Sequence, residues 1–158
     1  MQTITEKILN DTMLYGNIPV FTYHIAYPSF STTCVLSAAQ TANIYYMQLA
    51  ENTEQYCRTV LYPQAVESAR YITSNHPPFN RYTLDMNYQI TYNSGCITSL
   101  YMDTYTYMGG AHQELERISD TWDFSTGKQL HLDDISALTP AALNGLQTSV
   151  ERQIAERY

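Results

Sequence analysis

The strongest constraint on the fold is a strict alternation over residues 81–92, RYTLDMNYQITY. Every second side chain from Tyr82 to Tyr92 is aromatic or aliphatic, and the side chains between them are polar. Because successive side chains of a strand point to opposite faces of a sheet, this pattern predicts a strand with one buried face. The segment CITSLYMDTYTYM follows after NSG and predicts the return strand of an antiparallel hairpin.

The register of this hairpin has two solutions. A two-residue turn at Ser94-Gly95 would set Tyr88 opposite Tyr101. A one-residue slip would instead place Leu100 and Met102 against the apolar face of the first strand. We favour the first register, because Ser-Gly suits a two-residue hairpin turn of the primed type.

Two helices are expected on the sheet. Apolar side chains at three- and four-residue steps predict an amphipathic helix over residues 37–60, with Ser37 as its N-cap. Pro63 should break or kink this helix. A second helix is predicted over residues 139–157, where Thr139 is the expected N-cap. Because both helices need an apolar surface to cover, burial of the hairpin tyrosines is favoured over an exposed aromatic platform.

Two further strands complete the predicted sheet. IPVFTYHIAYP alternates over Ile18–Pro28 and should end at its proline, which has no N–H to donate to a neighbouring strand. ELERISDTWDF predicts a strand over residues 114–124, STGKQL a turn with a short strand end, and LDDIS a single helical turn. The fold class is therefore α+β, an antiparallel meander with two main helices packed on one face. We expect a single domain over residues 1–158, with residues 1–17 as an N-terminal extension.

The charge balance excludes one large class of partners. The chain has 15 Asp and Glu against 8 Lys and Arg, for a net charge of −7, and it has no run of basic residues. Nucleic-acid binding depends on clustered Lys and Arg, so we expect no nucleic-acid partner. No run of about 18 apolar residues is present, and the N-terminus lacks the pattern of a signal peptide. Membrane attachment would therefore need a segment absent from this chain.

The spacing of cysteines and histidines predicts neither a metal site nor a cofactor. Cys34, Cys57 and Cys96 form no CxxC pair, and no two histidines have the i, i+4 spacing of a helix-borne zinc site. The cysteine count fits either one disulfide with one free thiol or three thiols. Asp133-Asp134 could bind a metal, but a carboxylate that caps the following helical turn is favoured.

The stretch YTYMGGAHQ, residues 105–113, is the best candidate for a site. His112 follows two glycines at a strand junction and could meet Asp103 and Asp120 across adjacent strands. We favour a simpler interpretation, in which Gly109-Gly110 bends one strand into the next and His112 hydrogen-bonds the loop. The sequence contains no complete catalytic set, so we assign no catalytic residue. The candidate ligand-binding residues are Tyr105, Tyr107, Gly109, Gly110 and His112.

Four segments together resemble a known bacterial family. They are YPSF, AAQTANIYYMQL, YQITYNSGCITSLYMDTYTYMGGAH and TWDFSTGKQLHLDDI, which lie between Tyr27 and Ile135. From about Ile18 to its final helix, the chain resembles the extracytoplasmic domain of unknown function that accompanies peptidoglycan deacetylases. It is also similar to the extracellular part of the lysozyme-sensing anti-sigma factor. The most specific elements are the GGAH bend, Gly109–His112, and the FSTGKQLHLDD turn, Phe124–Asp134.

The resemblance implies an α+β fold, an extracytoplasmic or cell-envelope location and a non-catalytic role in binding or sensing. The implied partner is a protein such as lysozyme or a cell-wall glycan. The family usually continues beyond this last helix with further strands, so a module truncated at its C-terminus would have an open sheet edge and could form a homo-oligomer through it. The alternative functions are a hydrolase that uses His112 with a nearby carboxylate, and a purely structural or dimerisation module.

Overall fold

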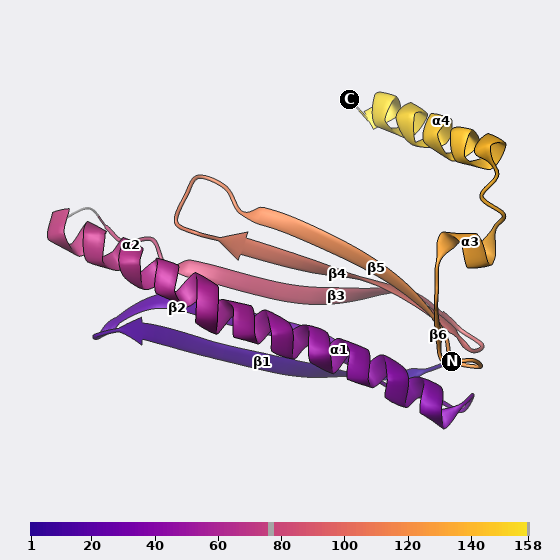
Figure 1. The fold of residues 1–158 in the computed structure, drawn as a ribbon, viewed down its shortest axis with the longest axis horizontal. Coiled ribbons are helices and arrows are strands. Elements are labelled where there is room, and N and C mark those ends of the chain that lie inside the picture. Colours follow the sequence, from indigo (N-terminus) through magenta and orange to yellow (C-terminus); the bar gives the residue numbers. More distant parts are fainter. Residues whose placement is uncertain (76–77, 158) are drawn as a thin grey trace. The chain divides into compact units, whose positions relative to one another are not determined.

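The computed structural model describes residues 1–75 and 78–157 (Figure 1). The chain divides after Lys128 into two compact units. The six-stranded sheet with its helices confirms the predicted α+β class. In chain order, the elements are β1 (Thr3–Tyr15), β2 (Ile18–Ser31), α1 (Leu36–Tyr56), a π-helical segment (Cys57–Leu61), α2 (Tyr62–Asn75), β3 (Tyr82–Ser94), β4 (Ile97–Tyr107), β5 (Glu114–Asp123), β6 (Lys128–Leu130), α3 (Leu132–Ile135) and α4 (Pro140–Arg157).

The strands follow one another across the sheet in chain order, from β1 to β6. The pairs β1–β2, β3–β4 and β4–β5 are antiparallel, whereas β2 and β3 are parallel, with Phe21–Ile25 beside Tyr82–Met86. A parallel pair cannot be joined by a hairpin, and here α1 and α2 make the crossover. The sheet is thus mixed where an antiparallel meander was expected, because the pattern of a strand does not tell the direction in which it pairs.

Residues 1–17, expected as an extension, contribute a strand of the sheet. β1 pairs with β2 from Thr3 to Tyr15, and the two are joined by the turn Gly16-Asn17, whose glycine has a φ of 60°. Glycine adopts this left-handed conformation without steric cost. β2 also runs past its proline at position 28 to Ser31. Its pairing with β3 stops at Ile25, so that beyond this point β2 has a neighbouring strand only on the side of β1. A missing N–H on the side of β3 therefore costs no hydrogen bond between strands.

The helical crossover passes Pro63 without a break. α1 is followed directly by the π-helical segment and then by α2. The N–H of Tyr62 donates to the carbonyl of Cys57, five residues earlier, so that the widened turn lies immediately before the proline. In a regular α-helix the proline ring would clash with the carbonyl four residues before it. A single π-helical turn relieves this clash while the helix continues.

The first turn of α1 is tied to the end of β5. The N-cap is Val35, not the predicted Ser37, and it makes no side-chain capping hydrogen bond. The N–H of Val35 donates to the carbonyl of Phe124 at 3.1 Å. This backbone contact joins segments far apart in the sequence, and for that reason no local sequence pattern reveals it.

Small side chains bring the crossover helices close to the sheet. α1 and α2 lie over one face, mainly against β2 (Figure 1). Their inner surface carries the buried Ala38, Ala42, Ala50, Ala65 and Ala69, while the strands supply the large side chains. Burial of each large apolar side chain stabilises the fold by roughly 1.5–3 kcal/mol. The larger core residues are Val20, Phe21, Tyr23, Ile25, Phe30, Tyr46, Leu61, Leu84, Met86, Leu100, Met102, Trp122 and Phe124.

The β3–β4 hairpin takes the slipped register, and the favoured register is wrong. Ser94 pairs with Ile97, so that Gly95-Cys96 forms the turn. In this register Leu100 and Met102 lie under the helices, where both are buried. The favoured register would have placed these two side chains on the opposite face of the sheet. Burial of two large apolar side chains therefore outweighs the turn preference of Ser-Gly.

The hairpin tyrosines consequently do not share one face. Tyr88 lies opposite Met102, not Tyr101, and is half-buried on the side of the helices. A bulge between Ile90 and Tyr92 turns the side chain of Tyr92 outward, and this side chain is 53% exposed. Tyr101 alternates with the buried residues of β4 and so lies on the face away from α1. The burial under the helices that was predicted for all the hairpin tyrosines therefore applies to only some of them.

The second unit contains α3 and α4. Thr139 is the N-cap of α4 as predicted, since its Oγ1 accepts a hydrogen bond from the N–H of Ala142 at 3.2 Å. The carboxylate of Asp134 accepts from the N–H of His131 at 2.9 Å, which confirms the predicted capping of the short helix α3. α4 carries a stripe of apolar residues, which consists of Leu143, Leu146, Val150 and Ile154.

The cysteines form one disulfide and one free thiol. Cys34, just before α1, is bonded to Cys96 in the β3–β4 turn. Cys57 is free and buried in the core, and its burial raises the pKa of the thiol to about 12. The sequence left open whether the chain has one disulfide with one free thiol or three thiols, and the structure has the disulfide.

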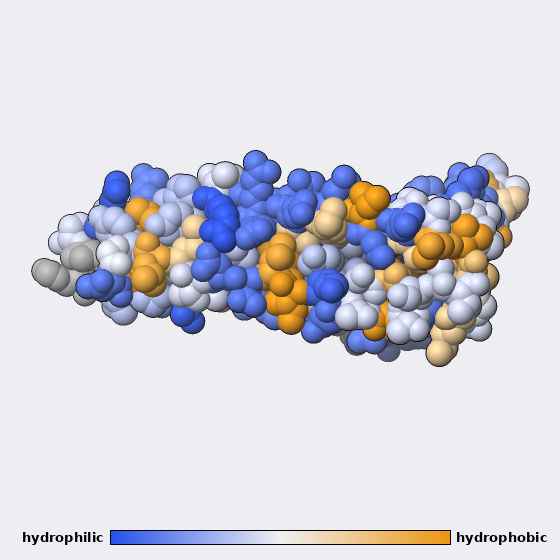
Figure 2. Space-filling model, turned by 90° about the horizontal axis from the view of Figure 1, so that it is seen from below, coloured by the Kyte–Doolittle hydropathy of each residue, from blue (hydrophilic) through white to orange (hydrophobic). Residues whose placement is uncertain are grey.

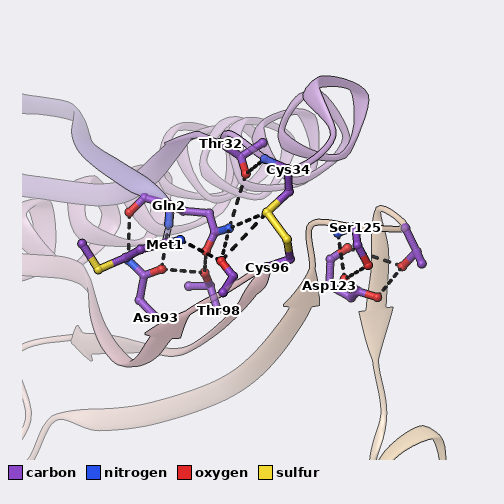
Figure 3. Close-up of a disulfide and its surroundings, with 11 residues drawn as sticks. Met1, Gln2, Thr32, Cys34, Asn93, Cys96, Thr98, Asp123 and Ser125 are labelled. Atoms are coloured by element: carbon purple, nitrogen blue, oxygen red, sulfur yellow. Dashed lines mark hydrogen bonds between the residues drawn. A yellow bond between two sulfur atoms is a disulfide. The ribbon is translucent and has the colours of Figure 1, made fainter.

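A buried glutamine joins β1 to the β3–β4 hairpin beside the disulfide (Figure 3). The hydroxyl of Thr98 donates to Oε1 of Gln2 at 2.6 Å, and both residues are buried. The side chain of Asn93 bonds the backbone of Gln2 twice, accepting from its N–H and donating to its carbonyl, each at 2.9 Å. Because these buried polar groups have partners, their burial carries no desolvation penalty for unmade hydrogen bonds.

A second buried polar chain joins α1 to β5. The indole N–H of Trp122 donates to the hydroxyl oxygen of Tyr46 at 2.9 Å, and that hydroxyl donates to Oδ2 of Asp120, also at 2.9 Å. All three residues are buried. Burial, together with the nearby carboxylate of Asp120, raises the pKa of the Tyr46 hydroxyl above its usual value of 10.0. The folded state therefore favours the neutral phenol.

We expect the Cys34→Ser/Cys96→Ser double variant to lose about 4 kcal/mol of unfolding free energy, because the disulfide no longer restricts the unfolded chain across 62 residues. Urea denaturation followed by circular dichroism measures the loss. A thiol reductant should lower the stability of the wild type and leave the double variant unchanged. Equal stability of the reduced and oxidised wild type would contradict the prediction.

The Tyr46→Phe variant is expected to be less stable by about 1–3 kcal/mol at neutral pH, because Asp120 and Trp122 lose a buried partner. The folded pKa of Tyr46 is raised, so its contribution is fully present below pH 10 and is lost as the pH rises further. The stability difference between wild type and variant should therefore shrink above pH 10. Urea denaturation from pH 8 to 11 tests this, and a constant difference would refute it.

Candidate functional site

An open groove lies on the helix-covered side of the sheet, within the first unit. It has a volume of about 730 Å³ and is bordered by the second half of α1 on one side and by β3, β4 and β5 on the other. α1 and α2 pack mainly over β2, which leaves this part of the sheet less covered. The lining residues are Leu49, Asn52, Thr53, Tyr56, Leu84, Met86, Met102, Thr104, Thr106, Met108, Glu114, Leu115, Glu116 and Ile118.

The floor of the groove is apolar, with hydroxyl groups along one strand. Leu84, Met86 and Met102 are buried and face the groove from β3 and β4. Thr104 and Thr106 continue the same face of β4, because every second residue of a strand points to the same side. Methionine side chains are flexible and polarizable, so a floor of this kind adapts to the shape of a ligand.

The rim of the groove is acidic. Glu114 and Glu116 lie on β5, and both are exposed. Among the described residues that line the groove, these two carboxylates are matched by no lysine or arginine. On the opposite wall, Tyr56 of α1 offers an aromatic ring that is 48% exposed, and Asn52 offers an amide. The groove therefore combines apolar surface with hydrogen-bonding groups and a net negative charge.

The predicted tyrosines lie on the other face of the sheet. Tyr105 and Tyr107 alternate with the groove-lining threonines of β4 and are half-buried. The hydroxyl of Tyr105 donates to Oδ2 of Asp103 at 3.5 Å. Arg117 donates to both carboxylate oxygens of Asp103, at 2.6 and 2.7 Å, and its guanidinium lies 4.0 Å from the ring centre of Tyr101. These hydrogen bonds lower the pKa of the Asp103 carboxyl.

The Gly-Gly bend joins β4 to β5, as predicted. Gly109 has a φ of 77°, a conformation that favours glycine, and a Cβ there would come within 3.2 Å of the ring of Tyr82. Gly110 lies in open space. The predicted hydrogen bond from His112 to the loop is not found: within residues 1–75 and 78–157 its exposed side chain has no hydrogen-bond partner.

The three groups considered for catalysis do not form one site. Asp103 bonds Arg117 on the face away from the helices, whereas Asp120 bonds Tyr46 under α1. His112 lies in the loop between their strands. The expectation that they meet is therefore wrong, because adjacent strands in this register place the two carboxylates on opposite faces.

Of the predicted stretch at residues 105–113, only Thr106 and Met108 border the groove, and neither was among the predicted ligand-binding residues. The other groove residues come from α1, β3, β4 and β5 and were not predicted as a site. The slipped hairpin register was the available signal, since it collects Met86, Met102, Thr104 and Thr106 on one face. No pattern in the sequence indicates that α1 would leave this face uncovered.

In the described residues, no three His, Cys, Asp or Glu side chains gather in a way that could hold a metal ion. None of the helices described is both long enough and apolar enough to cross a membrane. Figure 2 shows one side of the surface, where apolar residues form small patches separated by hydrophilic ones. Scattered patches of this kind are normal for a protein surface and mark no site of their own.

Comparison with known proteins identifies the family. Two crystal structures of DUF3298 family proteins share the fold. The protein from Bacteroides fragilis matches with a TM-score of 0.70 and 13% identity, over 98% of this chain and 69% of its own. The protein from Pseudomonas aeruginosa matches with a TM-score of 0.54 and 18% identity, over 94% of this chain and 64% of its own. No curated protein matches in sequence. A family model described as deacetylase PdaC matches residues 16–113, more than half of the chain, and the chain therefore belongs to the deacetylase PdaC family.

Proposed function

We propose that this chain is a non-catalytic binding domain of the cell envelope. Its partner, part of a protein such as lysozyme or a cell-wall glycan, would lie in the groove between α1 and β3–β5. The groove is the observation that carries the proposal. At about 730 Å³ it falls within the size range of ligand-binding clefts, and its lining is mainly apolar with a few polar groups, as is usual for such clefts.

The lining supports binding as the role of the groove. Methionine and leucine side chains offer apolar surface, and the hydroxyl groups of Thr104 and Thr106 offer hydrogen bonds that orient a ligand. The exposed ring of Tyr56 beside Asn52 suits either a sugar ring or an apolar side chain of a protein. The two carboxylates on β5, together with the net charge of −7, favour a basic protein.

The disulfide supports the proposed compartment. Cys34 and Cys96 are bonded to one another. Disulfides form and persist in oxidising compartments such as the periplasm and the cell surface, and they are rare in the reducing cytosol. An extracytoplasmic location is therefore part of the proposal, as is attachment near the cell wall.

If the groove is the binding site, the variants Tyr56→Ala and Met108→Ala should each weaken binding at least about tenfold, since each removes a side chain from its lining. Calorimetric titrations with lysozyme and with soluble peptidoglycan fragments measure the effect. Tyr92→Ala and Met47→Ala are the matched controls. Tyr92 is 53% exposed against 48% for Tyr56, Met47 is 40% exposed against 42% for Met108, and both controls lie outside the groove.

The two ligands separate the two kinds of partner. Binding of one ligand that depends on the groove variants and is insensitive to the controls supports the proposal and names the partner class. Absence of binding to both ligands, or equal losses in groove and control variants, would count against it.

A further inference from the structure

β5 carries an exposed strand edge along the rim of the groove. One of its edges pairs with β4 from Glu114 to Asp123. Among the described residues, the other edge is joined to β6, which has three residues and follows a short turn, so that β6 can pair with only a few residues at the end of β5. In the part of the chain that the structure describes, no other strand pairs with this edge, and residues 114–117 are exposed. Such an edge presents backbone N–H and C=O groups that an incoming strand can pair with.

The same segment of β5 forms one wall of the groove. Glu114, Glu116 and Ile118 point from this strand into the groove. A strand added at the edge would continue the sheet, and every second side chain of it would point to the groove side. Backbone hydrogen bonds would supply affinity, and the alternate side chains at the rim of the groove would supply selectivity.

We propose that β5 binds an extended segment of a partner protein by strand addition, and that this segment is basic and apolar in alternation. This inference rests on the proposed binding function and specifies its ligand. Opposite-charge pairs between neighbouring strands are favourable, so Lys or Arg is expected beside Glu114 and Glu116. Next to Ile118, the incoming strand should carry a leucine or another apolar residue.

Charge argues against a second copy of this chain as the occupant. Two β5 edges paired antiparallel around Glu116 would place carboxylates opposite one another, and like charges directly across a strand pair are destabilising. The net charge of −7 on each copy adds to that repulsion. A basic segment of another protein meets neither obstacle.

Two labelled peptides of about nine residues test the proposal on the full chain. In one, serine alternates with Lys, Lys, Leu and Leu; the other has the reverse order, so that both strand directions are covered. Fluorescence anisotropy should show binding of at least one of them, and replacement of its lysines by glutamate should abolish the signal. The Glu114→Lys/Glu116→Lys variant should bind the lysine peptide at least about tenfold more weakly and should prefer the glutamate peptide.

Two controls separate strand addition from general electrostatics. Glu51→Lys/Glu67→Lys changes the net charge by the same amount at exposed positions of α1 and α2 and should leave binding unchanged. In a bound strand only every second N–H faces β5. N-methylation of one alternate set of peptide nitrogens should therefore abolish binding, whereas N-methylation of the other set should be tolerated.

Three results would overturn strand addition by a basic segment. They are equal losses in both charge variants, tolerance of both N-methylated sets, and self-association of the chain through β5 in sedimentation experiments. Absence of binding to both lysine peptides, while lysozyme or glycan still binds in a groove-dependent way, would overturn this inference alone. Failure of every ligand would overturn the proposed function as well.

Discussion

The packing of the crossover helices on β2 sets the rest of the structure. Their buried alanines let the helix backbone approach the sheet closely, and the large side chains of β2 fill the space between them. The parallel pairing of β2 with β3 requires this crossover. Because the helices lie mainly over β2, the inner face of β3, β4 and β5 has only the second half of α1 beside it. The groove is therefore a consequence of where the core sits.

The second hairpin needs other links to the core, because β2 and β3 pair only from Phe21–Tyr82 to Ile25–Met86. The disulfide joins the turn of the β3–β4 hairpin to the segment before α1. The buried Gln2 joins the two strands of this hairpin to the start of β1. The chain from Trp122 through Tyr46 to Asp120 joins its neighbour β5 to α1. These links fix the sheet face that lines the groove relative to the helix that forms its other wall. A ligand would thus meet a preformed site, which lowers the entropic cost of binding.

Local patterns predicted the parts of the fold that depend on local chemistry. The alternation of apolar and polar residues over Tyr82–Tyr92 correctly predicted β3, and Thr139 correctly predicted the start of α4. β1 was not predicted, although Gly16-Asn17 is a known hairpin signal. Exposed apolar residues such as Ile8 interrupt the alternation of polar and apolar residues that would have indicated a strand. The hairpin register, the Val35 N-cap and the groove depend on contacts between segments distant in the sequence. Turn chemistry favoured Ser94-Gly95, and burial of the core side chains decided otherwise.

The acidic residues of β5 have a role in this arrangement even when the groove is empty. A long exposed edge invites pairing between copies, and charged side chains on an edge are a common protection against it. Glu114 and Glu116 repel the same edge of a second copy, yet they attract a basic segment. If β5 binds a basic segment as proposed, the same two carboxylates would keep the free protein apart from its own copies and select its partner. The negative net charge acts in the same direction on both processes, because it slows the approach of like molecules and speeds that of basic ones. For that reason a neutral or acidic ligand would gain no affinity from these charges and would depend on the apolar floor and on the hydrogen-bonding groups of the groove.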